Sequence, residues 1–162
     1  MAMVWGVDVA EQDHPRIFIP PPLIIVGTLV AGLEIDGRLT GHADFWLPIA
    51  LAGGLIALAG AAVIVVALGL FGAANTRAEP WKRASTLVSR SIYNNTRNPM
   101  YLGMLLAYVS GAIGIQSVTA FLLLIPLVMV FDRVIVAREE DYLTHRFGAS
   151  YGKYRLRVPR WF

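Results

Sequence analysis

Long apolar segments separated by shorter charged ones dominate this chain of 162 residues. Residues 17–33, 45–76 and 98–131 contain no Asp, Glu, Lys or Arg. Because a helix needs about 20 apolar residues to cross a bilayer, the pattern predicts helices that span a membrane. We therefore expect an all-α integral membrane protein.

Prolines and small residues indicate where these helices begin and end. Pro20, Pro21 and Pro22 suit the start of a helix, since proline lacks an amide donor. A single helix over 98–131 would be roughly 51 Å long, against a hydrocarbon core of about 30 Å. The sequence Gly-Ala-Ile-Gly-Ile-Gln-Ser at 111–117 offers a break, which predicts a tight helical hairpin.

The expected organisation is one domain, residues 1–162, with about four transmembrane helices. The helices are expected at about 22–35, 47–72, 100–112 and 118–145, with a cytoplasmic connection at 75–97 and a tail at 146–162 that carries a cytoplasmic amphipathic helix. Small residues of the second helix are expected where neighbouring helices approach closely: Gly53, Gly54, Gly60 and Ala61.

Charge is concentrated in two parts of the chain. The composition is 56% hydrophobic and 15% charged, against about 25% charged in a soluble domain. Of the 14 basic and 11 acidic residues, 17 lie in residues 77–97 and 132–162. By the positive-inside rule these segments face the cytoplasm and the acidic loop 36–44 faces outward. The pI near 9.5 then reflects topology and attraction to membrane lipids, and no nucleic-acid partner is expected.

Several kinds of site are excluded. The chain has no cysteine, which removes thiol catalysis, disulfides and Cys-ligated metals. It has no zinc-protease, P-loop, nucleophile-elbow or dinucleotide-binding motif. His14, His42 and His145 are too scattered to suggest a metal site. Acidic residues precede the first apolar run, so no cleaved signal peptide is expected.

One candidate for chemistry is Thr-Arg-Asn-Pro-Met-Tyr-Leu-Gly at residues 96–103. Pro99 suits the first turn of a helix, where its missing donor has no consequence. The unpaired amides of that turn favour an anionic or electron-rich ligand group. The alternative is a plain helix cap with Arg97 and Tyr101 at the membrane interface.

A second candidate is the charged helix at residues 132–143. Adjacent Glu139 and Glu140 point about 100° apart on a helix, so they are not a paired acid and base. Arg133 and Glu140, seven residues apart, are expected to share a face. One carboxylate then binds ligand hydroxyl or ammonium groups while the other holds an arginine. The alternative is a solvated helix end with ordinary ion pairs.

The third candidate is the aromatic and basic tail at residues 147–162. Gly148 is expected to end a helix, and Tyr151 and Tyr154 then fall on one side of a short basic helix. Trp161 and Phe162 suit an anchor at the membrane surface.

Together these segments resemble the isoprenylcysteine carboxyl methyltransferases and their bacterial, phospholipid methyltransferase-like relatives. The resemblance implies methyl transfer from S-adenosylmethionine to a lipophilic acceptor, the carboxylate or amine of an isoprenoid or lipid. The cofactor-binding residues that it implies are Leu87, Val88, Tyr93, Arg97, Asn98, Pro99, Tyr101, Gly103, Glu139, Glu140 and Tyr151. The catalytic residues that it implies are Arg133, Arg138 and Glu140, with either arginine orienting an acceptor carboxylate.

The sequence departs from this family at two positions. Asn98 stands where the founding enzymes have His, and Ser91 stands where relatives usually have Gly. These departures keep a non-catalytic membrane homologue as an alternative. A membrane reductase of the sterol-reductase type, which uses NADPH, is a second alternative, because such reductases carry a segment similar to residues 97–101 and a related C-terminal tail. The expected partners are a lipophilic acceptor and membrane lipids, and the expected location is a bacterial inner membrane with the site facing the cytoplasm. The sequence makes no prediction of oligomeric state.

Overall fold

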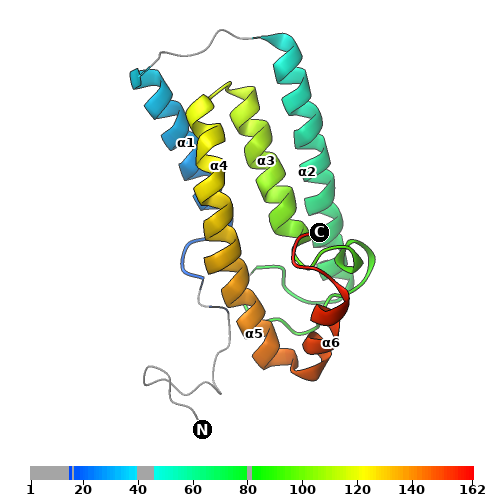
Figure 1. The fold of residues 1–162 in the computed structure, drawn as a ribbon. Helices are drawn as coiled ribbons and strands as arrows, with labels where there is room; N and C mark the ends of the chain where they lie inside the picture. The colour runs from blue at the N-terminus through cyan, green and yellow to red at the C-terminus, as the bar shows by residue number, and fades with distance from the viewer. Residues whose placement is uncertain (1–14, 16, 40–45, 80–81) are drawn as a thin grey trace, which may run out of the picture.

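The protein is a bundle of long helices with a smaller extension of short helices and loops at one end (Figure 1). The structure is a computed structural model and describes residues 15, 17–39, 46–79 and 82–162. The regular elements in these ranges are all helical. They are α1 (Pro21–Leu39), α2 (Leu47–Ala73), the short 3₁₀ helix η2 (Ser91–Asn94), α3 (Pro99–Gly114), α4 (Val118–Val130), the π-helix η3 (Phe131–Val136), α5 (Ala137–Phe147) and α6 (Ala149–Arg157).

Two of the described helices are long and apolar enough to cross a membrane. These are α2 and the continuous helix Val118–Phe147, which comprises α4, η3 and α5. The other two helices that were expected to span the membrane are α1 and α3. Helix α1 carries charged residues in its last turns, and α3 has only 16 residues. The expectation of four spans therefore remains a prediction.

Some sequence expectations fall outside the described residues. They concern the acidic residues of the N-terminal segment with the absence of a signal peptide, the acidic loop from residue 40 onward, and His14 and His42.

Helices α2 and α3 pack closely because glycines line their contact. A Cβ atom on Gly60 would lie 2.9 Å from the carbonyl oxygen of Gly103, and one on Gly53 would lie 3.1 Å from the Ile113 side chain. Gly54, by contrast, has open space around it, and Ala61 is exposed. Gly53 and Gly60, seven residues or two helical turns apart, therefore make the expected close approach. Gly54 and Ala61, which were also expected there, do not.

Helix α1 is joined to α4 on the other side of the bundle. Gly32 leaves room for Ala120, whose atoms would lie 2.6 Å from a Cβ at that position. Near the end of α1, Asp36 accepts hydrogen bonds from the hydroxyls of Ser117 and Thr119, at the start of α4. The side chain thereby caps the first turn of α4. This contact lies beyond residue 35, where α1 was expected to end.

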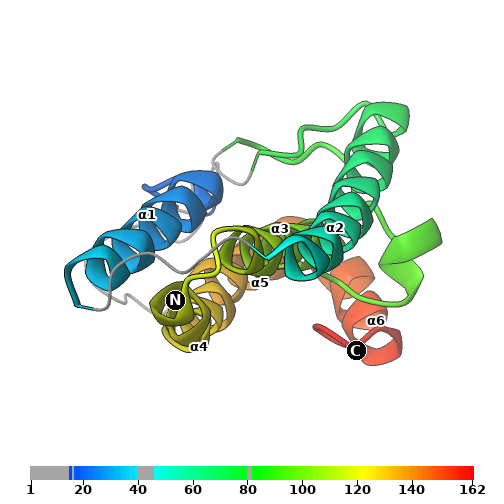
Figure 2. The same cartoon turned by 90° about the horizontal axis from the view of Figure 1, so that it is seen from above.

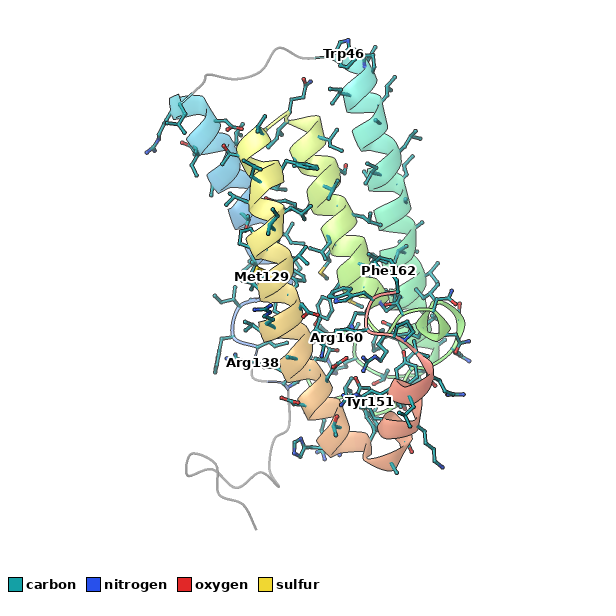
Figure 3. All side chains as sticks on the ribbon, viewed as in Figure 1. Trp46, Met129, Arg138, Tyr151, Arg160 and Phe162 are labelled. Atoms are coloured by element: carbon teal, nitrogen blue, oxygen red, sulfur yellow. The ribbon has the colours of Figure 1, made fainter. Side chains whose placement is uncertain are left out.

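The two ends of the bundle differ in polarity. Trp46 lies at one end, and Arg138, Tyr151 and Arg160 lie at the other (Figure 3). The connection from α2 to α3 and the C-terminal residues gather at that second end (Figures 1 and 2). Between the ends, α2 exposes large apolar side chains such as Leu51, Leu55 and Leu58. Such a surface suits a lipid environment.

Candidate functional site

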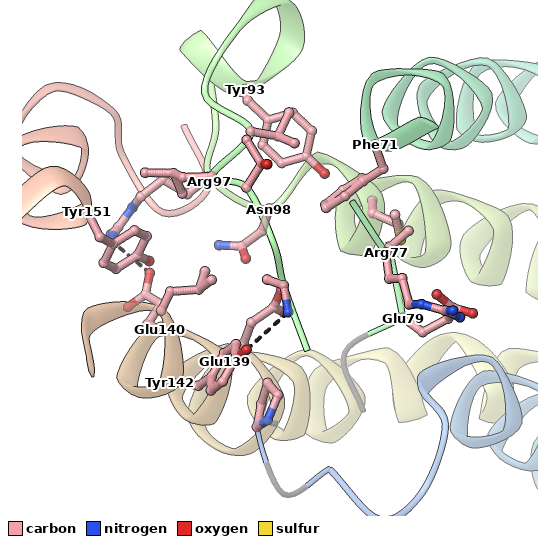
Figure 4. A pocket seen from close by; sticks show the side chains of 18 of the residues that line it. Phe71, Arg77, Glu79, Tyr93, Arg97, Asn98, Glu139, Glu140, Tyr142 and Tyr151 are labelled. Carbon is pink, nitrogen blue, oxygen red and sulfur yellow. Dashed lines mark hydrogen bonds and ion pairs between the residues drawn. The ribbon is translucent and has the colours of Figure 1, made fainter. Parts of the chain in front are cut away.

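A pocket that is partly open to solvent lies at the polar end of the bundle (Figure 4). Its walls come from the end of α2, the connection to α3, the start of α3, and helices α5 and α6. The pocket brings together most of the residues expected to bind a cofactor. These are Leu87, Val88, Tyr93, Arg97, Asn98, Tyr101, Glu139, Glu140 and Tyr151.

Four expected site residues lie elsewhere. Pro99 is buried in the first turn of α3, where it starts the helix. Gly103 faces α2, and a Cβ there would lie 2.7 Å from the Ile64 side chain. Arg133 and Arg138 are exposed and do not line the pocket. The structure therefore gives Pro99 and Gly103 a packing role and leaves the two arginines outside.

The expectation that Arg133 and Glu140 share a face is wrong. Arg133 is exposed, whereas Glu140 is 5% exposed and faces the pocket. Arg133 lies within the π-helix η3, which winds more loosely than an α-helix because its hydrogen bonds run from residue i to i+5. Seven residues therefore do not bring the chain back to the same face.

Arg97 and Glu140 form a buried ion pair in the pocket. Nη1 of Arg97 lies 2.8 Å from Oε1 of Glu140, and the two side chains are 11% and 6% exposed. Despite this ion pair, Nε and Nη1 of Arg97 and Oε1 of Glu140 have no hydrogen bond to the described residues. Buried charged atoms of this kind are costly unless a hydrogen-bonding group reaches them. They mark the place where a polar ligand group fits.

Tyr151 completes this corner of the pocket from α6. Burial and the nearby Glu140 charge raise the pKa of Tyr151 to about 12, although a hydrogen bond with Arg97 acts in the opposite direction. The phenol therefore keeps its proton at neutral pH. It adds an uncharged hydroxyl beside the ion pair.

Glu139 has a different environment from its neighbour. It accepts a hydrogen bond of 2.6 Å from the hydroxyl of Tyr101, which reaches across from α3. No cationic side chain of the described residues pairs with it, whereas Glu140 contacts both Arg97 and Arg160. Glu139 is thus the carboxylate of the pocket wall that is open to a cationic ligand group.

Residues 48–150, more than half of the chain, match the phospholipid methyltransferase family. The chain belongs to this family. A protein of Haemophilus influenzae, described only as an uncharacterized protein, is 36% identical over 62 residues, which are 38% of this chain and 98% of that one. No solved structure matches. The match confirms the resemblance found in the sequence, and the two apolar helices together with the family indicate a membrane methyltransferase.

The far side of the pocket is also charged. Arg77 and Glu79 lie opposite Arg97 and Glu140 across the pocket (Figure 4). Glu79 pairs with Lys82 at 2.5 Å, and this hydrogen bond lowers the pKa of Glu79. From the sequence, Arg77 and Lys82 were used only to predict which side of the membrane this segment faces. Their position directly after an apolar helix was the available sign that they lie near the site.

Asn98 is hydrogen-bonded to the C-terminal segment of the chain. Its Nδ2 donates a hydrogen bond of 2.9 Å to the carbonyl oxygen of Arg160, which also accepts one of 3.0 Å from Thr96. Tyr154 donates a hydrogen bond of 2.8 Å to the carbonyl oxygen of Tyr93. The tail therefore holds the connection that forms one pocket wall, a role that the sequence motif did not reveal.

Proposed function

We propose that this protein transfers a methyl group from S-adenosylmethionine to a lipophilic acceptor at the cytoplasmic face of a bacterial inner membrane. The acceptor group is the carboxylate or amine of an isoprenoid or lipid. The observation that carries the proposal is a single pocket in which the buried pair Arg97–Glu140 and the carboxylate of Glu139 meet at the polar end of apolar helices. Family membership supports the reaction class.

The residues present fit S-adenosylmethionine. Arg97 offers buried donors to a carboxylate, and Oε1 of Glu140 offers an acceptor to an ammonium or hydroxyl group. The carboxylate of Glu139 suits a positively charged ligand group. The rings of Phe71 and Tyr93, whose centroids lie 5.8 Å apart in an edge contact, add aromatic surface for the adenine of the cofactor. When bound, the cofactor supplies an electrophilic methyl group on a sulfonium.

In this proposal the main catalytic role of the protein is to align the acceptor atom with the methyl group of the cofactor. Displacement at a methyl group needs the acceptor atom in line with the leaving sulfur more than it needs acid or base catalysis. A carboxylate acceptor needs no base. An ammonium acceptor must first lose a proton, and Glu139 is available to take it. Tyr101 holds Glu139 in place for either role.

The acceptor is expected to come from the bilayer and the cofactor from water. The pocket lies beside the last turn of α2 and the first turn of α3, where Phe71 and Met100 form part of its wall. Farther along α2, away from the pocket, the exposed side chains are apolar, such as Leu51, Leu55 and Leu58. In this proposal α1 to α4 all lie in the membrane. The positive-inside rule, applied to the two basic segments, supports a pocket on the cytoplasmic side.

Transfer of a tritiated methyl group tests the proposal. Purified protein in nanodiscs receives S-adenosylmethionine labelled in the methyl group, with either an aminophospholipid or a carboxylate-bearing isoprenyl thioether as acceptor. We expect label in the organic phase with one acceptor, its loss in Glu140→Gln, and its retention in Arg133→Gln. No transfer to either acceptor, or oxidation of NADPH instead, contradicts the proposal.

A further inference from the structure

The segment that follows α6 places a second arginine on Glu140. Nη2 of Arg160 lies 2.6 Å from Oε2 of Glu140, and Nη1 lies 3.1 Å from Oδ1 of Asp132. Glu140 thus has Arg160 at one carboxylate oxygen and Arg97 at the other. The four groups form a set of two positive and two negative charges at the base of the pocket.

Arg160 reaches Glu140 from outside the pocket. Arg97, Glu140 and Tyr151 line the pocket, and Arg160 does not. The hydrogen bond of Arg160 engages Oε2 alone, so that Oε1, which has no hydrogen bond from the described residues, stays beside Arg97. A carboxylate fixed at one oxygen presents the other in a defined direction.

Other groups hold the C-terminal segment in place. The backbone N–H of Arg97 donates a hydrogen bond of 3.0 Å to the carbonyl oxygen of Pro159. The indole Nε1 of Trp161 donates one of 2.8 Å to Asp132. The carbonyl oxygen of Arg160 itself accepts from Thr96 and Asn98. None of these bonds uses the guanidinium of Arg160, so its removal is expected to leave the segment attached.

We infer that Arg160 is a positioning residue, which orients Glu140 for the ligand of the pocket. This inference rests on the proposed function, because the ligand group that Glu140 receives is taken to belong to S-adenosylmethionine. The guanidinium restrains the Glu140 side chain and balances its charge beside Arg97. Without it, Glu140 is free to turn both oxygens toward Arg97 and close the corner that the ligand needs.

Calorimetric binding of S-adenosylhomocysteine to the full-length protein in detergent tests the inference. We expect Arg160→Gln to weaken binding by about 10- to 100-fold, as the loss of a charged hydrogen bond would. Arg160→Lys recovers part of the affinity, since lysine keeps the charge but not the planar fork. Arg157→Gln, which changes an exposed arginine at the end of α6, is the matched control and leaves binding unchanged.

A double-mutant cycle separates positioning from a general structural effect. If Arg160 acts through Glu140, Arg160→Gln weakens binding in the wild-type background and adds little once Glu140→Gln is present. Equal loss in both backgrounds overturns the inference, as does wild-type affinity in Arg160→Gln. Should Arg160→Gln fail to fold, the same cycle with Arg160→Lys decides by the same criterion. If the wild-type protein itself does not bind S-adenosylhomocysteine, the proposed function fails first and the inference falls with it.

Discussion

Tyr101 and Tyr108 lie two helical turns apart on α3 and make hydrogen bonds of equal length for different purposes. The hydroxyl of Tyr101 donates to Glu139 at 2.6 Å in the pocket, and that of Tyr108 donates to the carbonyl oxygen of Ala120 at 2.6 Å. Both side chains are almost fully buried. The pair therefore offers a matched comparison of a site residue with a packing residue.

Tyr101→Phe is expected to weaken binding of S-adenosylhomocysteine by up to about tenfold. The change removes one hydrogen bond to a carboxylate and keeps the ring, so Glu139 loses the group that fixes its direction. Calorimetry in detergent gives the affinity, and the melting temperature reports whether the fold is intact.

Tyr108→Phe is the control, and its effect is expected on stability alone. It leaves the Ala120 carbonyl oxygen without that donor, at a cost of about 1–3 kcal/mol. Affinity for S-adenosylhomocysteine should stay at the wild-type value. Equal affinities in Tyr101→Phe and the wild type would show that the Tyr101–Glu139 contact does not shape the ligand site.

At the scale of helices, the contact between α2 and α3 depends on Gly103. Gly103→Ala places a methyl group 2.7 Å from Ile64 and 2.9 Å from the carbonyl oxygen of Gly60. We expect a loss of about 1–3 kcal/mol in the free energy of unfolding, the usual cost of overpacking. Unfolding in mixed detergent monitored by circular dichroism measures it. Affinity of the folded variant for S-adenosylhomocysteine should not change, because Gly103 does not line the pocket.

Gly69→Ala on α2 is the control for this change. Nothing lies within 4 Å of a Cβ at Gly69, and alanine is the better helix former by about 1 kcal/mol. We expect stability equal to or above that of the wild type. A similar loss in both variants would mean that glycine is needed for some reason other than the contact between α2 and α3.

The elements show which parts of the fold could be predicted from the sequence. Apolar runs and prolines mark the starts of α2 and α3 because they depend on local chemistry. The orientation of α5 could not be predicted in the same way. The loose turn at η3 has no signature in the apolar pattern, so Arg133 was placed on the face of Glu140 by α-helical spacing.

The site shows the same division. Arg97, Tyr101 and Glu139 could be found because they belong to two recognisable segments, and the fold brings those segments together at one pocket. Arg160 was missed because its contact with Glu140 spans 20 residues and depends on how the tail turns back after α6. Only a three-dimensional arrangement reveals such a contact.

At the scale of the whole molecule, the proposal assigns the two ends of the helix bundle to opposite sides of the membrane. Arg38, at the end of α1, has a side chain 81% exposed, and Lys153, in α6 at the pocket end, is also exposed. Because the chain has no cysteine, a single introduced cysteine is a unique label. We expect an impermeant maleimide to label Lys153→Cys only from the cytoplasmic side of bacterial membrane vesicles, and Arg38→Cys only from the opposite side.

Labelling of both variants from the same side would contradict the four-span arrangement. Labelling of Lys153→Cys from the outside alone would reverse the orientation of the whole bundle and separate the pocket from cytoplasmic cofactor. In each case the wild-type chain, which has no thiol, gives the background signal.

The measurement that tests the central claim most directly is binding of S-adenosylhomocysteine against NADPH to the wild-type protein by calorimetry in detergent. The account predicts a saturable signal with S-adenosylhomocysteine, none with NADPH, and a weaker but still measurable affinity in folded Glu140→Gln. Preference for NADPH, or no binding of S-adenosylhomocysteine by folded protein, would contradict it.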